Sequence, residues 1–183
     1  GLLRVPLAQD NATRQVLREK MAAALRRGRL TIAALGRMKS GPERDLVDTY
    51  VDRASATGRP VGLGPVSEQE IDNRSLTGAD AESRALAASL PAGATLVLLD
   101  ERGKALASRD FARTLERWRD EGVRETVFAI GGADGHDRSQ LPQPDLVMAF
   151  GPAVWPHKLV RVMLAEQIYR AVSILAGTPY HRD

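Results

Sequence analysis

Short apolar runs alternate along the chain with longer stretches in which apolar residues recur at helical spacing. This alternation is typical of a parallel α/β sheet, because each buried strand needs a crossover helix before the next one. Residues 94–99 (ATLVLL) form the strongest run and are continuously apolar, as expected of a strand buried on both faces. The predicted strands are residues 30–35, 60–66, 94–99, 126–130 and 145–150, and the predicted helices are residues 40–57, 79–90, 108–122 and 158–176. Residues 67–78 are ambiguous by the same criteria.

The length of 183 residues suits one globular domain with a substantial core. We expect this domain to span residues 30–183, behind an N-terminal extension of residues 1–29 that is disordered or forms a short basic helix. Residues 1–30 carry seven Lys or Arg and two Asp or Glu, a net charge of +5, whereas the remainder carries −2. The overall positive charge therefore says little about the body, and any RNA-binding surface on it must be local.

The lack of cysteines, the small number of histidines and the lack of long apolar segments limit the classes of protein to which the chain can belong. The chain has no cysteine, which excludes disulfides, thiolate metal sites and a cysteine nucleophile. Only three histidines remain as imidazole ligands, which argues against a zinc enzyme, and we predict no metal. No window approaches the roughly 18 uninterrupted apolar residues of a membrane-spanning helix. We expect a soluble, cytoplasmic protein with no membrane partner.

Ligands of open parallel sheets bind beyond the carboxyl ends of the strands, so the residues after each apolar run form the candidate site. Three segments qualify: residues 99–103 (LDERG), 130–135 (IGGADG) and 150–157 (FGPAVWPH). The glycine-rich segment leaves backbone amides accessible, but it matches neither the dinucleotide fingerprint nor a P-loop, and a simple tight turn explains it equally well. Asp100 and Glu101 could accept hydrogen bonds from ribose hydroxyls or could be solvated loop acids.

The last predicted helix and the tail after it hold the densest set of reactive side chains. Arg161 and Arg170 interrupt an otherwise apolar helix, a pattern typical of a salt-bridged surface or of an interface. The tail offers a stacking ring at Tyr180, a group that titrates near neutral pH at His181 and a phosphate-binding guanidinium at Arg182. A frayed terminus and a functional tail are equally compatible with these residues.

Four segments together resemble a known family: WPHKLVRVMLAEQIYRA, GTPYHR, LLDERGK and AIGGADG. They are similar to the bacterial 23S rRNA (pseudouridine-N(3)) methyltransferase H family of the SPOUT superfamily. The resemblance covers most of the chain, from near Leu30 to the C-terminus, and residues 1–29 have no counterpart in it. It implies a single-domain, Rossmann-like parallel sheet whose C-terminal segment is threaded into a trefoil knot. It also implies a homodimer that holds S-adenosylmethionine within the knot.

The resemblance implies a reaction and a set of cofactor contacts. The reaction is transfer of the cofactor's methyl group to ring nitrogen 3 of a pseudouridine in the large-subunit rRNA of assembled ribosomes. The implied cofactor contacts are Leu99, Gly131, Phe150, Gly151, Pro152, Ala153, Val154 and Trp155. Members of the family often have Met-Thr where Ala153-Val154 stand, and main-chain contacts survive that difference.

The implied active site is composite, because one subunit holds the cofactor and the tail of the other covers it. The residues implied in RNA placement and catalysis are His157, Arg161, Tyr180, His181 and Arg182. His181 is the candidate base, since it is the only tail residue that titrates near neutral pH. Arg161 and Arg182 would clamp phosphates. Tyr180 would stack on a base.

We assign Glu166 and Arg170 to a buried pair or a dimer contact. Two other functions stay open. The first is a non-catalytic ribosome- or RNA-binding module on the same fold, which the Ala153-Val154 difference favours. The second is a nicotinamide or nucleotide enzyme, which the missing glycine fingerprint disfavours. Binding of S-adenosylmethionine separates the first from the methyltransferase, and titration with a nicotinamide cofactor tests the second.

Overall fold

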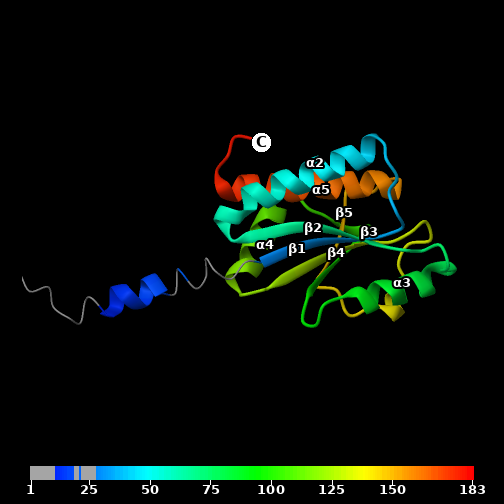
Figure 1. Ribbon diagram of the computed structural model, residues 1–183, viewed down its shortest axis with the longest axis horizontal. Coiled ribbons are helices and arrows are strands. Elements are labelled where there is room, and N and C mark those ends of the chain that lie inside the picture. The colour runs from blue at the N-terminus through cyan, green and yellow to red at the C-terminus, as the bar shows by residue number, and fades with distance from the viewer. Residues whose placement is uncertain (1–10, 19–20, 22–27) are drawn as a thin grey trace, which may run out of the picture.

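The computed structural model describes residues 11–18, 21 and 28–183. In this part of the chain five strands form one parallel sheet in the order β2-β1-β4-β3-β5 (Figure 1). The strands are β1 (Gly28–Leu35), β2 (Leu63–Ile71), β3 (Thr95–Ala105), β4 (Glu125–Ile130) and β5 (Leu146–Ala149). The helices are α2 (Pro42–Gly58), α3 (Gly78–Ser89), α4 (Ser108–Asp120) and α5 (His157–Ala176), with 3-10 turns η1 (Arg59–Val61) and η2 (Arg138–Gln140). The predicted single α/β domain with a parallel sheet is confirmed.

The chain before the sheet is described only in part. Residues 11–18 form an exposed helical segment, and most of the predicted extension otherwise lies outside the described residues. β1 begins at Gly28, two residues before the predicted strand. The strand starts earlier because the N–H groups of Gly28 and Arg29 donate to the carbonyls of Gly62 and Arg124 over 3.1 and 2.8 Å.

Helices cover both faces of the sheet, with α2, α4 and α5 on one face and α3 on the other (Figure 1). Alternate residues of β1 divide between the two cores: Ile32 packs with the three-helix layer, whereas Ala33 packs with Leu86 of α3. Such burial on both faces explains the continuous apolar runs of the central strands.

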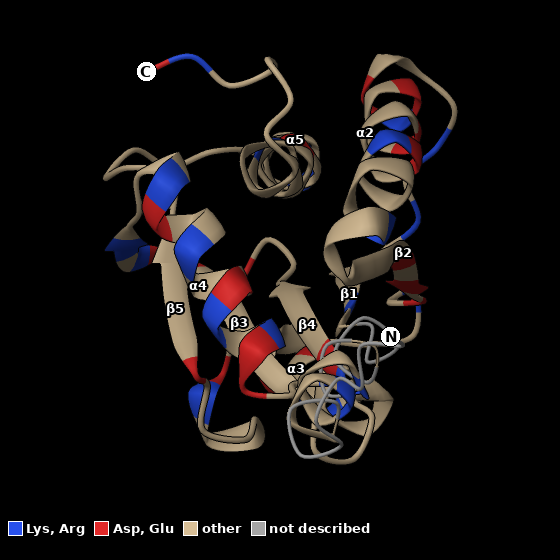
Figure 2. Ribbon diagram, turned by 90° about the vertical axis from the view of Figure 1, so that its left-hand side faces the viewer, with Lys and Arg blue, Asp and Glu red and all other residues tan. Residues whose placement is uncertain are grey.

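Helix α5 lies between α2 and α4, and Figure 2 shows it end-on between them. Its inward residues, including Leu164, Ile168 and Val172, are fully buried. The helix ends at Gly177, whose φ of 73° is the left-handed conformation that glycine adopts without strain. α5 therefore runs through the centre of the helical layer, and its first residue marks the carboxyl edge of the sheet.

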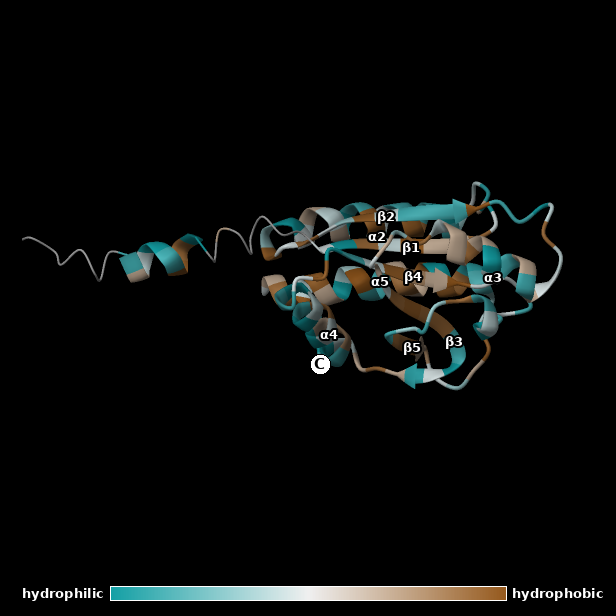
Figure 3. Cartoon of the chain, turned by 90° about the horizontal axis from the view of Figure 1, so that it is seen from below, coloured by the Kyte–Doolittle hydropathy of each residue, from teal (hydrophilic) through white to brown (hydrophobic). Residues whose placement is uncertain are grey.

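Two strands extend beyond their predicted bounds, and both extensions are polar. β2 starts at Leu63 and continues to Ile71, so part of the ambiguous segment is an edge strand, the hydrophilic one in Figure 3. β3 continues past Leu99 to Ala105 after a register shift and pairs again with β5. Gly103 permits this close approach, because a Cβ there would lie 2.7 Å from the backbone of Met148.

Candidate active site

The carboxyl ends of β3, β4 and β5 meet at one edge of the sheet, since Leu99 pairs with both Ile130 and Met148. The loops after these strands enclose a cavity of about 370 Å³, a volume typical of small-molecule sites. Seven predicted cofactor residues line it: Leu99, Gly131, Phe150, Gly151, Ala153, Val154 and Trp155. The eighth, Pro152, is outside the lining, whereas His157 is part of it. The strand-end segments singled out in the sequence thus converge on one cavity.

The glycine segment forms one wall of the cavity through a tight turn. The N–H of Gly135 donates to the carbonyl of Gly132 over 3.0 Å. A Cβ at Gly131 would lie 3.0 Å from the carbonyl oxygen of Gly135 and 3.3 Å from Cε1 of His136. Because these neighbours leave little space for a side chain, bare backbone faces the cavity at this position.

His136 is a cavity residue that sequence reasoning missed. Its ring lines the cavity, and Nε2 lies 3.2 Å from the carbonyl oxygen of Ala129. Burial lowers the pKa of His136 below its ordinary value, and hydrogen bonding to that carbonyl offsets only part of the effect. The ring is therefore neutral at pH 7. The only signal in the sequence is a histidine directly after the glycine turn.

The other walls of the cavity are the loop after β3, which carries a carboxylate, and the apolar loop after β5. Asp100 lines the cavity, and its Oδ1 accepts a hydrogen bond from the backbone N–H of Arg102 over 2.9 Å. The last loop is closed by Trp155, whose Nε1 donates to the carbonyl of Phe150 over 3.1 Å. Val154 and Trp155 nevertheless remain 77% and 44% exposed. Large exposed apolar side chains beside a cavity indicate an interaction surface.

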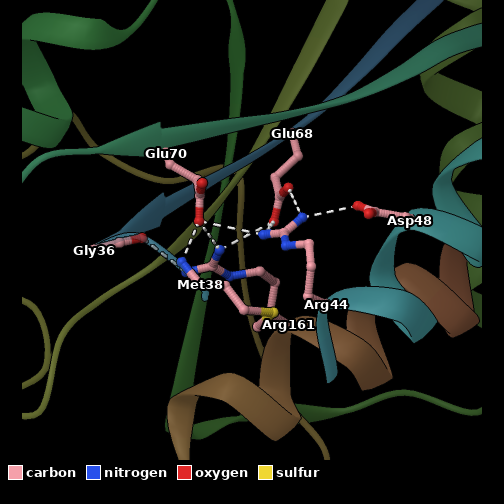
Figure 4. Close-up of polar contacts among 7 residues, drawn as sticks. All are labelled: Gly36, Met38, Arg44, Asp48, Glu68, Glu70 and Arg161. Atoms are coloured by element: carbon pink, nitrogen blue, oxygen red, sulfur yellow. Dashed lines mark hydrogen bonds and ion pairs between the residues drawn. The ribbon is translucent and has the colours of Figure 1, made fainter. Parts of the chain in front are cut away.

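Arg161, the predicted phosphate clamp, is only 2% exposed and is not part of the cavity lining. Its Nη1 donates to Glu70 over 2.6 Å and to Glu68 over 3.0 Å (Figure 4). Its Nη2 donates to the carbonyl of Gly36 over 3.1 Å. Arg44 of α2 joins the same cluster, 2.6 Å from Glu68. In this position Arg161 holds α5 against the ends of β1 and β2.

The tail folds back and packs along the second half of α5 instead of fraying. The Tyr180 hydroxyl donates to Glu166 over 3.0 Å, and Arg170 forms a half-buried ion pair with the same carboxylate at 2.6 Å. The Arg170 guanidinium also lies 4.8 Å from the centre of the Tyr180 ring, a cation–π contact. Nη1 of Arg170 lies 3.2 Å from Nδ1 of His181, whose Nε2 lies 3.0 Å from Asp183. The tail residues and the Glu166–Arg170 pair thus form one polar cluster.

An ion pair from α4 fixes the end of this tail. Arg109 lies 2.6 Å from Asp183. Hydrogen bonds from Arg109 and then from His181 lower the pKa of Asp183 to about 2. Arg182 is exposed to solvent. The tail folds back along α5 to Glu166 and Arg170, nine and thirteen residues after His157, so about 14–20 Å of helix separates these contacts from His157 at the cavity.

Comparison with known proteins places this geometry in a family. Residues 29–181 match the family model described as predicted SPOUT methyltransferase. The chain belongs to the SPOUT methyltransferase family. A relative from Maricaulis maris, named ribosomal RNA large subunit methyltransferase H, is 75% identical over 155 residues, covering 85% of this chain and 99% of its own. Relatives of the same name from Ruegeria pomeroyi and Cereibacter sphaeroides are 52% and 54% identical over 154 residues, covering 84% of this chain and 99% of theirs.

Membership of this family makes the chain a methyltransferase, which requires a methyl donor. Among residues 11–18, 21 and 28–183, no grouping of His, Asp and Glu side chains is suited to holding a metal ion. None of the helices in that same part of the chain has the length and apolar character needed to cross a bilayer.

Proposed function

We propose that the protein uses S-adenosylmethionine to methylate nitrogen 3 of a pseudouridine in large-subunit rRNA, acting on the ribosome as a cytoplasmic homodimer with a knotted C-terminal segment. The cavity at the ends of β3, β4 and β5 carries the proposal, because its lining contains seven of the eight residues that the family resemblance assigns to the cofactor. The name shared by the relatives, ribosomal RNA large subunit methyltransferase H, supports rRNA as the substrate.

The lining of the cavity suits a cationic nucleoside cofactor. The bare backbone at Gly131 allows close approach, and the carboxylate of Asp100 can accept hydrogen bonds from ribose hydroxyls. The lowered pKa of His136 keeps its ring uncharged, so that ring does not repel a sulfonium. The apolar side chains of Val154 and Trp155 can cover the purine.

The chemical demands on the chain itself are limited. S-adenosylmethionine supplies a methyl group that its sulfonium has already activated. The residues of the chain must align the target nitrogen with that methyl group and assist loss of the nitrogen's proton. His181 is the proposed proton acceptor, and its ring is oriented by Arg170 on one side and Asp183 on the other.

The distance between tail and cavity supports a composite site. None of residues 178–183 lines this chain's own cavity, and the tail contacts α5 about 14–20 Å of helix beyond His157, so a second copy is needed to bring a tail to the cavity. A twofold axis that pairs two α5 helices in antiparallel fashion places each tail near the other subunit's cavity. The exposed side chains of Val154 and Leu159 supply apolar surface for such a contact.

The direct test is calorimetric titration with S-adenosylmethionine, alone and with ribosomes that lack the modification, followed by mass mapping of the rRNA. We expect binding and one new methyl group on a large-subunit pseudouridine. Absence of cofactor binding, both alone and with ribosomes, would favour the non-catalytic ribosome-binding module. Binding of a nicotinamide cofactor in place of S-adenosylmethionine would favour the nucleotide enzyme, and either outcome would contradict the proposal.

A mixed dimer tests the composite site. Ala153→Trp adds a large side chain at an exposed position of the cavity lining, and Arg182→Ala removes the exposed tail cation, so each homodimer should be inactive while retaining its melting temperature. Co-expression in equal amounts should restore about a quarter of wild-type activity, since half of the dimers then contain one intact site. Arg84→Ala, an exposed position on α3, is the matched control for Arg182. Absence of recovery, with mixed dimers verified by mass, would show that each chain uses its own tail.

A further inference from the structure

The loop between β1 and α2 presents two cations on an anchored backbone. It lies at the same edge of the sheet as the cavity, and Arg37 and Lys39 in it are exposed. Between them, Met38 is 5% exposed, and its N–H donates to Glu70 over 2.6 Å. The buried methionine and its hydrogen bond fix the loop at its centre. The two cationic side chains therefore extend into solvent on either side of a fixed point.

The Arg161 cluster provides the anchor (Figure 4). Arg161 donates to Glu70 and to the carbonyl of Gly36, so it contacts both the start of the loop and the group that binds its centre. Arg44 pairs with Glu68 at 2.6 Å and with Glu70 at 3.3 Å. The nearby carboxylates are thus engaged by buried or half-buried guanidiniums.

Arg37 and Lys39 are left without a carboxylate partner in the described part of the chain. Together with Ser40 they line a shallow groove of about 550 Å³. Both acidic residues that line this groove are paired, Asp48 with Arg44 at 2.9 Å and Glu70 with Arg161 at 2.6 Å. The groove therefore offers unpaired positive charge to a ligand.

The groove and the cavity border neighbouring strand ends, because β1, which leads into the loop, pairs with β4, whose last residue lines the cavity. His157 lines the cavity, and Arg161, one turn later on the same face of the helix, binds the backbone of the loop. An extended strand whose base enters the cavity therefore passes close to the loop. The body of the chain carries a net charge of −2, so affinity for a polyanion must come from such local sites.

We propose that Arg37 and Lys39 bind backbone phosphates of the rRNA strand whose target base enters the cavity. This inference rests on the proposed function and adds a substrate-binding surface to it. Phosphate contacts position a nucleic acid without reading its sequence, so the loop contributes affinity and register. The buried anchor fixes the backbone that carries the two cations. A phosphate bound by these side chains is therefore held at a defined distance from His157.

The test compares two double variants that remove the same charge. Arg37→Ala/Lys39→Ala removes the loop cations, whereas Arg53→Ala/Arg59→Ala removes two exposed arginines at the far end of α2. Methylation kinetics on ribosomes lacking the modification are measured at several salt concentrations. For the loop variant we expect KM for ribosomes to rise roughly tenfold near 0.1 M salt and the logarithmic salt slope to fall by about 1.4. The α2 variant, and the charge-preserving Arg37→Lys/Lys39→Arg, should behave like wild type.

Two outcomes would overturn the inference alone, and a third would overturn the proposed function together with it. Equal KM values for the loop and α2 variants would show that the loop does not bind substrate. A raised KM with an unchanged salt slope would show a contact that is not to phosphate, such as one to a ribosomal protein. Wild type that binds no S-adenosylmethionine and methylates no ribosome would remove the proposed function and the inference with it. Titration of the loop variant should give the wild-type affinity for S-adenosylmethionine.

Discussion

Replacing Arg161 with methionine tests whether this buried guanidinium holds the helical layer to the sheet. The substitution keeps the length of the side chain but removes a charge that is 2% exposed and bonded to Glu68, Glu70 and the Gly36 carbonyl. Removing one partner of a buried ion pair costs about 3–5 kcal/mol, because the other charge stays buried. Glu68 and Glu70 are 13% and 30% exposed and keep Arg44 as a partner. We therefore expect a loss near the lower end, about 3 kcal/mol.

Chemical and thermal denaturation measure this loss. For a chain of this size, about 3 kcal/mol corresponds to a fall in melting temperature of roughly 6–12 °C. The control is Arg84→Met, which removes an exposed arginine 3.6 Å from Asp80 and should change the free energy of unfolding by less than about 0.5 kcal/mol. A loss below about 1 kcal/mol for Arg161→Met would refute the anchoring role and return Arg161 to the candidate phosphate clamps.

The same variant should change the response to acid. Burial opposes ionisation of Glu70, but hydrogen bonds from the Met38 N–H and from Arg161 outweigh it and lower the pKa of Glu70 below its ordinary value. A lowered carboxylate pKa contributes stability above the unfolded-state pKa near 4.3, and that stability is lost as the pH falls through the folded-state pKa. The difference in stability between wild type and Arg161→Met should therefore narrow below about pH 4. A difference that stays constant from pH 7 to pH 3 would contradict this origin.

Three further predictions follow from other parts of the structure. Gly103→Ala should cost about 2 kcal/mol in chemical denaturation, because its Cβ would lie 2.7 Å from the backbone of Met148 in the neighbouring strand. Asp183 should titrate by carbon-13 NMR with a pKa of about 2, and Arg109→Ala should raise that value by removing its strongest hydrogen-bond donor. Deleting residues 1–20 should leave the melting temperature unchanged, since residues 11–18 are exposed; a clear fall would show that the segment belongs to the fold.

The apolar runs predicted the sheet well because its central strands are buried on both faces. The predicted strand 126–130 matches β4 nearly to the residue, and the predicted strand 94–99 matches the apolar first half of β3. The strand-end rule then selected the cavity, because carboxyl ends of parallel strands meet at one edge. His136 escaped notice because no spacing in the sequence relates it to the Ala129 carbonyl or to the cavity.

The polar half of β2 and the buried position of Arg161 have one physical cause. The second half of β2 reads as a polar segment because it contains Glu68 and Glu70. Arg161 reads as a surface or RNA-binding residue because it interrupts an apolar helix. The carboxylates of β2 explain the arginine in α5, and the arginine explains the carboxylates. The guanidinium and the two carboxylates pair although more than ninety positions of sequence separate them. Local periodicity carries no information about such a pair.

The distribution of paired and unpaired cations reconciles an acidic body with an RNA substrate. Arg44 and Arg161 form ion pairs with carboxylates within the fold. By contrast, Arg37 and Lys39 are exposed beside the cavity, and Arg182 is exposed on the tail. The loop contacts α5 at Arg161, whereas the tail contacts it at Glu166 and Arg170 and does not line the cavity of its own chain. In the proposed antiparallel dimer, Arg182 of the partner subunit approaches the cavity edge where Arg37 and Lys39 lie. Dimerisation would then concentrate positive charge at each cavity mouth without a basic surface on the rest of the body, which is what a small enzyme needs to bind RNA locally.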